Sequence, residues 1–553
     1  MKRFRLRLIL TILCAVGGLA LMFRPGFTPR SFAQSTTTPA YPAWLRGFLY
    51  QAKHAHTRGF LTIKPPAVIP QDYLTADPTG ILENYQPGGP TTTSNNAFFQ
   101  SFGTNGRTCF SCHQPETAWS ITPGSVQNVF DKTRGQDPVF ADFDGQNCPN
   151  TLSASPTLLQ RKLASSLLLN KGLIRIGLGL PDGTNGSPIP EWKYLKIIKD
   201  PTGCENNSTF GITSPVPSIS MYRRPLNSTN LTMNGQLLSF VGPPFPVSQQ
   251  GSIMWDGREP SLAHQADDAT LGHAQATGPL SSSKNAEAVA FETGIFTAQY
   301  KDQKAGLLTA KSATGGAKDL STFAAVVNTL FNLAGFNPDF FTANPAQEFD
   351  MFLPWFNNTA VTPQQASIAR GEDIFNNKSF FVNGVSGFNE IVGQNAPTTC
   401  STCHSNVDSG SDVVPGFRHL GIGDNVAAED VSGQGQSTAT VLPATKDLPL
   451  FEFWCPVGSI DFFTNTKIDP NDTTKSYDVL QTNDPGVALI SGKCNDLGQF
   501  KVPRLRGFAA RAPYFHNGNA ATAWDVVNFY NVRFSIGLSY QDKTDLVNFL
   551  NSL

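Results

Sequence analysis

Two copies of one short pattern restrict this chain more than any other feature: CFSCH at residues 109–113 and CSTCH at residues 400–404. Cys-x-x-Cys-His is the attachment pattern of c-type haem, in which two thiols add to the porphyrin vinyl groups and the adjacent His supplies an axial nitrogen. A thioredoxin-like redox pair or half of a zinc site would not explain a His directly after each second Cys. We therefore expect two covalently attached haem c groups. Their thioethers and axial nitrogens would come from Cys109, Cys112, His113, Cys400, Cys403 and His404.

The composition favours a compact protein with many loops over a disordered or coiled-coil chain. Among 553 residues, Gly (48), Pro (40) and Phe (41) are abundant and charged residues make up only 15%. Residues 1–33 hold six Lys/Arg and no acid, so the remainder has 35 basic against 42 acidic residues, or −7. This mild acidity gives no electrostatic basis for binding nucleic acid, and it suits a basic soluble electron carrier as partner.

The N-terminus has the layout of a secretory signal. Residues 2–7 are basic, residues 8–23 are apolar, and residues 31–33 (SFA) offer small side chains for cleavage before Gln34. We predict a signal peptide at residues 1–33 and a periplasmic protein. An uncleaved membrane anchor is the alternative, because the apolar run is about as long as a short membrane span.

Four cysteines remain outside the signal and the haem motifs. An even remainder in an exported protein indicates disulfides. Three pairings are open, and we favour Cys148–Cys204 and Cys455–Cys494 because each pair lies within one insertion between conserved-looking blocks.

The periodicity and the turn residues predict a mainly α protein with two cytochrome c-type haem lobes and long irregular loop insertions. The N-terminal lobe would span residues 34–360, with an insertion at about 120–215 that holds one helix near 156–169. The C-terminal lobe would span 361–553, with an insertion at about 406–495. Thr362, Pro363 and Gln365 form a helix start with a capping box. Two further helices are expected to open at Thr522 and Ser539.

Three more sequence blocks accompany the haem motifs. MWDGR at 254–258 lies between the two motifs, and KVPRLR at 501–506 and APYFHNG at 512–518 follow the second. Together with both motifs, they resemble the bacterial di-haem cytochrome c peroxidase family, including its MauG-like branch. The two long insertions have no counterpart in the short members of that family.

The resemblance implies a function for each lobe. The N-terminal haem would meet hydrogen peroxide, and the C-terminal haem would receive electrons from a small donor protein, a cytochrome c or a cupredoxin. Trp255 matches the Trp that lies between the two haems. The resemblance leaves a homodimer open. Two alternatives to a peroxidase are a MauG-like or rubber-oxygenase-like oxidase acting on a protein or organic substrate, and a di-haem electron carrier with both irons closed.

The far ligand of the second iron is expected to be Tyr530. The peroxidase branch uses Met there, but no Met follows Met351 in this chain. The MauG-like branch has Tyr at the place that Tyr530 matches, and Tyr is a known haem ligand. His516 is the rival, although the family keeps this His near the haem without making it the usual axial partner.

The resemblance also implies a Gln and a Glu on the open side of the first haem. Gln265 matches the Gln, but the Glu position falls on Gln275, whose amide does not exchange protons at a useful pKa. His273, two residues earlier, is expected either to take over the acid/base role or to ligate the iron.

The family holds a calcium ion between its lobes, so calcium is a further candidate cofactor here. The backbone carbonyls of Arg511 and Pro513 match two of its ligands. The position of a ligand Asn falls on Arg223, and a cation beside the site disfavours calcium.

Overall fold

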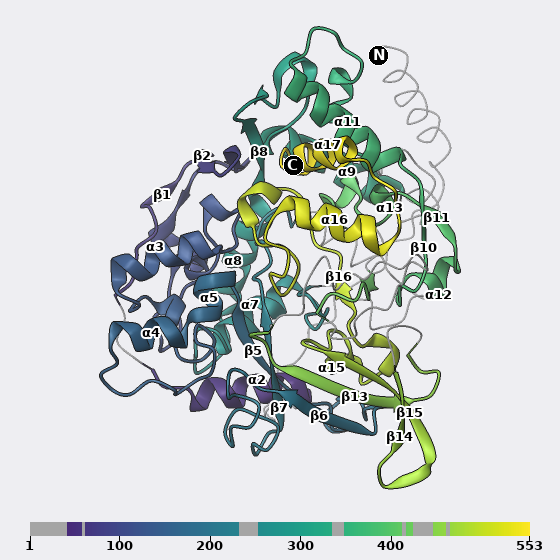
Figure 1. The fold of residues 1–553 in the computed structure, drawn as a ribbon. Coiled ribbons are helices and arrows are strands. Elements are labelled where there is room, and N and C mark those ends of the chain that lie inside the picture. The colour runs from purple at the N-terminus through teal and green to yellow at the C-terminus, as the bar shows by residue number, and fades with distance from the viewer. Residues whose placement is uncertain are drawn as a thin grey trace, which may run out of the picture. The chain divides into compact units, whose positions relative to one another are not determined.

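Helices and small sheets alternate along the chain in the computed structural model (Figure 1). The structure describes residues 41–57, 61–231, 253–334, 348–411, 416–423, 446–460 and 465–553. About 34% of residues are helical and 19% are in strands, which form six small antiparallel sheets within the described part. The protein is therefore mixed α/β, and the prediction of a mainly α fold is wrong.

The helices differ widely in length. They are α2 (Ala43–His54), α3 (Pro123–Thr133), α4 (Leu158–Ala164), α5 (Ser166–Lys171), α7 (Leu262–Leu271), α8 (Ser282–Gly294), α9 (Ala317–Ala334), α11 (Pro363–Asn377), α12 (Asn389–Val392), α13 (Cys400–Cys403), α15 (Ala488–Ser491), α16 (Ala523–Arg533) and α17 (Tyr540–Leu550).

Four sheets have two strands and two have four. The pairs are β1 (Val68–Ile69) with β4 (Thr91–Thr92), β5 (Ile174–Gly179) with β7 (Ser218–Arg223), β10 (Phe380–Val382) with β11 (Ala396–Thr398), and β12 (Phe417–Arg418) with β16 (Phe500–Lys501). One four-stranded sheet has the strand order β2 (Asp72–Asp77), β3 (Gly80–Tyr85), β8 (Phe296–Asp302), β9 (Gly306–Leu307). The other has the order β14 (Asn465–Asp469), β15 (Asp472–Thr482), β13 (Leu450–Pro456), β6 (Tyr194–Lys199).

The two insertions, expected to be irregular, build one sheet together. Strand β6 of the first insertion pairs antiparallel with β13 of the second, with Leu195 opposite Phe453. Alternate residues of β13 are buried in one apolar core, where Phe451 and Phe453 are fully enclosed. Glu452 and Trp454, on the other face of the strand, are buried as well, so both faces of β13 are covered. In Figure 1 this sheet lies at the lower edge of the view.

Two pairs of cysteine sulfurs lie at disulfide distance, and they are the favoured pairs. The sulfurs of Cys148 and Cys204 are 2.23 Å apart, and those of Cys455 and Cys494 are 1.97 Å apart. Each bridge joins residues of one insertion, so each ties its own insertion into a smaller loop.

The helix starts expected near the C-terminus are present. Thr362 caps α11 with a capping box to Gln365, and Thr522 and Ser539 cap α16 and α17 in the same way. Helices α11, α16 and α17 pack together around a core that includes Phe375, and their inner faces supply walls of the second cavity described below. In the first insertion, the single helix expected near 156–169 is instead two short helices, α4 and α5.

Residues 41–553 cluster as one unit, so the lobe boundary near residue 360 stays a prediction. The predicted signal lies outside the described residues. Among the helices that the structure describes, none has the length and apolarity needed to cross a bilayer.

Candidate functional site

Each haem motif begins a short helical turn at its first cysteine. Residues Cys109–Ser111 form a 3-10 turn after Thr108, and α13 begins at Cys400 after Thr399. In both turns the threonine and the side chain three residues later form a capping box. The turn brings the His backbone N–H to the carbonyl of the first Cys, at 3.0 Å in both motifs. Two thiols and an imidazole are thereby held close together.

The two histidines are prepared as metal ligands in the same way. Nδ1 of His113 lies 2.8 Å from the carbonyl oxygen of Trp119, and Nδ1 of His404 lies 2.8 Å from that of Gly410. A carbonyl only accepts, so Nδ1 carries the proton and Nε2 keeps the lone pair that a metal needs. Burial lowers the pKa of His113 to about 4 and also lowers that of His404. Both imidazoles are therefore neutral at pH 7.

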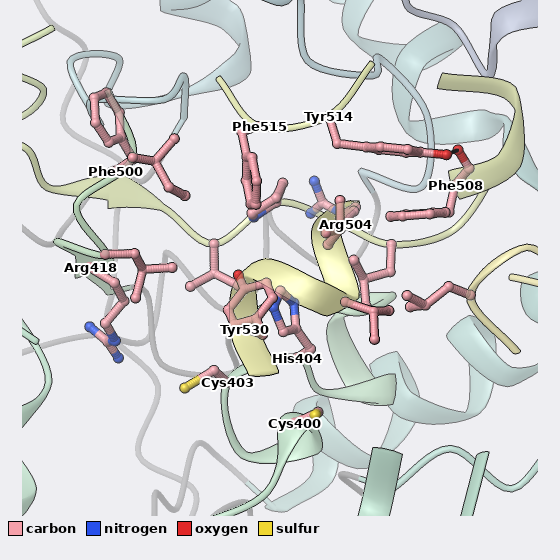
Figure 2. A pocket seen from close by; sticks show the side chains of 18 of the residues that line it. Cys400, Cys403, His404, Arg418, Phe500, Arg504, Phe508, Tyr514, Phe515 and Tyr530 are labelled. Carbon is pink, nitrogen blue, oxygen red and sulfur yellow. Dashed lines mark hydrogen bonds between the residues drawn. The ribbon is translucent and has the colours of Figure 1, made fainter. Parts of the chain in front are cut away.

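Each motif opens onto its own largely apolar cavity. The space free of protein atoms is about 1770 Å³ at the second motif and about 1550 Å³ at the first, with the open solvent at the cavity mouth included. Figure 2 shows the second cavity, with Cys400, Cys403 and His404 together below Phe515 and Tyr514. Apolar walls with a few convergent polar groups are typical of cofactor sites.

Tyr530 lies beside His404 in the second cavity (Figure 2). The two rings have centroids 6.4 Å apart and are nearly perpendicular, at 87°. Helix α16 presents Tyr530 on the face that also carries Val526 and Val527 into the cavity wall. Burial raises the pKa of the Tyr530 phenol. The rival His516 also lines this cavity, but its ring is stacked on Phe500 at 3.8 Å.

His273, predicted from the sequence as an acid/base group or an iron ligand, lines the first cavity. Its Nδ1 is hydrogen-bonded to the carboxylate of Asp144, which also pairs with Arg107. Burial works against the charged form of Asp144, but the charge of Arg107 and the bond from His273 outweigh it and lower the pKa of that carboxyl. Gln265, on α7, lines the same cavity as His273 and His113.

Gln275 is not among the residues that line the first cavity. Its Nε2 donates to the carbonyls of Ala52 at 2.7 Å and Ala55 at 3.3 Å, and its Oε1 accepts from Asn105. Its backbone adopts a left-handed conformation, with φ at 54°, in the turn after α7. The side chain thus ties this turn to α2, away from the place that the resemblance assigned to it.

Glu292 is a residue that the sequence analysis missed. It lies on α8, lines the first cavity and is 8% exposed. Its Oε2 is buried and has no hydrogen-bond partner within the described part of the chain. Burial raises the pKa of Glu292 to about 8, so its carboxyl keeps its proton at neutral pH. The available signal was an acid directly after Phe291, on the helix face that Ala288 shares.

Trp255 lies in the walls of both cavities. Its indole Nε1 donates to the carbonyl oxygen of Arg224 at 2.7 Å, and its ring meets that of His516 edge-on with centroids 6.2 Å apart. The next residue, Asp256, is fully buried between the guanidinium groups of Arg223 and Arg258. The Trp-Asp-Gly-Arg block is therefore held by hydrogen bonds and ion pairs on both sides of the indole.

The charges between the cavities suit the carboxylate groups of haem. Lys501 and Arg504 line both cavities. Arg504 pairs with Asp408 at 3.0 Å, yet its buried Nε has no hydrogen-bond partner among the described atoms. Buried cations with too few anions favour an acidic ligand. The cysteines, the neutral histidines and these cations together fit a haem in each cavity.

The residues matched to calcium do not fit that ion. The carbonyl of Arg511 already accepts a hydrogen bond from the guanidinium of Arg224, at 2.8 Å. Arg223 stands at the position of the ligand Asn, and its guanidinium pairs with Asp484 at 2.6 Å. Pro513 lines the second cavity. Two guanidinium groups in place of neutral or anionic oxygens oppose a divalent cation.

Comparison with known proteins gives one local sequence match. No protein-family model matches the chain. A stretch of 81 residues is 38% identical to the cytochrome-c peroxidase IdrP1 of Denitromonas iodatirespirans and takes in 13% of this chain but only 22% of that protein.

Two solved structures align only loosely. Hydrazine synthase of Kuenenia stuttgartiensis has a TM-score of 0.27 at 15% identity, over 60% of this chain and 73% of that one. A MauG-like protein associated with microbial copper homeostasis has 0.25 at 14% identity, over 83% and 87%. Scores this low establish no shared fold. The local sequence match supports the resemblance to the di-haem peroxidase family and does not single out a branch of it.

Proposed function

We propose that the chain is an exported di-haem c-type peroxidase that reduces hydrogen peroxide with electrons from a small redox protein. The observation that carries this proposal is the pair of cavities, each lined by its own Cys-x-x-Cys-His motif, with Trp255 in the walls of both. The local match to a cytochrome-c peroxidase supports it.

The reaction consumes two electrons and two protons for each peroxide and releases two waters. Haem bound in the two cavities would supply the redox-active irons, one to receive electrons and one to meet peroxide. Cys400 and Cys403 would hold the haem that receives electrons, and Cys109 and Cys112 would hold the haem that meets peroxide. Trp255, which lies in the walls of both cavities, would offer a stepping place for an oxidising equivalent that passes between them.

Proton delivery at the first cavity falls to two side chains. Glu292 holds a proton on its carboxyl at neutral pH, because burial disfavours its charged form. The Nδ1 of His273 is hydrogen-bonded to Asp144, so its ring is held in place with Nε2 left for a proton or a metal. Together they provide the acid/base groups that cleavage of an O–O bond needs, in place of the amide of Gln275.

Export and partner follow from charge and from the predicted signal. A signal peptide at 1–33 would direct the protein to the periplasm, where the two disulfide pairs are stable. The mildly acidic mature chain suits a basic cytochrome c or a cupredoxin as electron donor.

One observation favours a second function, a MauG-like oxidase of a protein or organic substrate. Tyr530 lies ring to ring with His404, and a phenolate ligand stabilises ferric over ferrous iron. An iron that resists reduction is better suited to storing oxidising equivalents than to accepting electrons from a carrier.

Optical and EPR spectra of the ferric and half-reduced holoprotein, taken before and after adding peroxide, separate these functions. A high-spin signal that peroxide consumes, with turnover of reduced cytochrome c, is the result expected of a peroxidase. Long-lived optical changes without cytochrome turnover would favour the oxidase. Two low-spin irons inert to peroxide and O2 would contradict both and leave an electron carrier.

A further inference from the structure

Arg224 joins three separate segments of the chain through its guanidinium. Its Nη1 donates to the carbonyl of Lys171 at 2.9 Å, and its Nη2 donates to those of Ile121 at 2.7 Å and Arg511 at 2.8 Å. Lys171 ends α5, and Arg511 ends a 3-10 turn, so two of these carbonyls are helix ends that attract a cation. The residue is 4% exposed.

The backbone of the same residue holds the parts that lie between the cavities. Its N–H donates to the carbonyl of His516 at 2.6 Å, and its carbonyl accepts from Nε1 of Trp255 at 2.7 Å. Arg224 lines both cavities, as Trp255 does. The indole of Trp255 and the backbone carbonyl of His516 are therefore both hydrogen-bonded to the backbone of the residue that carries this guanidinium.

Three backbone carbonyls that converge on one charge resemble part of a calcium site, since calcium binds six to eight oxygens, many of them carbonyls. Here the charge is covalently part of the chain. The guanidinium of Arg511 lies close enough to repel that of Arg224, so positive charge is already gathered at this place. A divalent ion would add to that crowding.

There is also little free space around the guanidinium of Arg224. A Cβ atom on Gly172 would stand 2.1 Å from Nη1 of Arg224, so only glycine leaves room for the side chain. Gly172 also has a left-handed φ of 63°, which glycine adopts without strain.

We propose that the guanidinium of Arg224 takes the place of the inter-lobe calcium of related proteins and positions Trp255 between the two haem cavities without any metal. Arg224 acts as a positioning residue, because its own contacts are to carbonyls. This inference rests on the proposed function in one respect, that Trp255 takes part in electron transfer between the two haems. Its first test measures metal content and needs no peroxide, so the two can fail separately.

That first test uses the wild-type holoprotein, purified with calcium in the buffers and then desalted. Elemental analysis should find well below one calcium per chain, and EGTA should leave the optical and EPR spectra unchanged. One calcium per chain, with a spectral change when EGTA removes it, would overturn the proposal.

The second test measures electron transfer between the two haems after pulse reduction. Arg224→Gln should slow it by at least about tenfold, because the neutral amide cannot bridge three carbonyls, and the Arg224 backbone carbonyl that accepts from Trp255 is then no longer held in place. Arg224→Lys keeps the charge and should recover part of the rate. Arg161→Gln is the matched control, since Arg161 also donates to a backbone carbonyl, that of Arg134 at 3.0 Å, and does not line either cavity. A native rate in Arg224→Gln would refute the positioning role.

Discussion

The protonated Glu292 predicts an unusual dependence of stability on pH. Burial raises the pKa of Glu292 in the folded protein to about 8, whereas the ordinary value for a glutamate in an unfolded chain is 4.5. Because the folded pKa is raised, the contribution of Glu292 is fully present below the unfolded pKa and is lost as pH rises through the folded pKa. The difference of about 3.5 pKa units, at about 1.4 kcal/mol each, sets an upper limit of about 5 kcal/mol.

Glu292→Gln replaces the carboxylic acid with a neutral amide of the same shape and removes this term. Between pH 5.5 and pH 9, the wild type should lose about 3 kcal/mol of unfolding free energy that the variant keeps. Guanidinium unfolding of both proteins at a series of pH values measures the difference. Glu287→Gln is the control, because Glu287 lies on the same helix but pairs with Lys284 at 2.8 Å and does not line the cavity.

The same variant tests the catalytic proposal by a separate readout. If Glu292 delivers a proton, the rate of peroxide consumption should fall by about 10²–10⁴ in Glu292→Gln, as is usual for lost acid/base catalysis. The wild-type rate should decline above about pH 8, where the carboxyl ionises. A variant with the stability slope of the wild type would refute the buried neutral acid, and one with full activity would refute its role in proton delivery.

Four further variants test other contacts. Tyr530→Phe should abolish one low-spin signal in the ferric EPR spectrum, and an unchanged spectrum would remove the ligand assignment. Arg223→Met leaves two buried aspartates without their shared cation and should cost about 3–5 kcal/mol in guanidinium unfolding. Arg370→Met, at a half-exposed ion pair, should cost less than about 1 kcal/mol, and equal losses would contradict the argument from burial. Replacing Cys455 and Cys494 by serine opens a loop of 39 residues and should lower the unfolding free energy by about 4 kcal/mol, with an unchanged midpoint counting against the bridge.

Features encoded within a few residues could be predicted from the sequence. The capping box of Thr362 and Gln365 depends on side chains three positions apart, and α11 begins where that box places it. The strand β6 could not be predicted in this way. Its partner β13 lies in the other insertion, so neither stretch by itself shows which strand it pairs with. The expectation of irregular insertions failed because the turns carry the visible signal and the pairing is not local.

The same division holds for the candidate site. His113 and His404 come from a contiguous motif, and the structure gives both the same Nδ1 hydrogen bond. Glu292 could not be predicted, because a lone Glu on a helix is ordinarily solvated. Its burial arises only when segments far apart in the sequence close the first cavity around it. Gln275 was placed by alignment to the family, but a left-handed residue in the turn after α7 directs its side chain elsewhere.

The shared sheet of the two insertions also sets an order of events during biosynthesis. Strand β6 is made long before β13, so its edge waits exposed until the C-terminal half arrives. The first Cys-x-x-Cys-His motif therefore emerges long before Phe451 and Phe453, which belong to the apolar core against which Cys112 packs. A chain cut before residue 446 lacks β13 and its neighbours, and it should self-associate through the orphan edge rather than survive as an independent half.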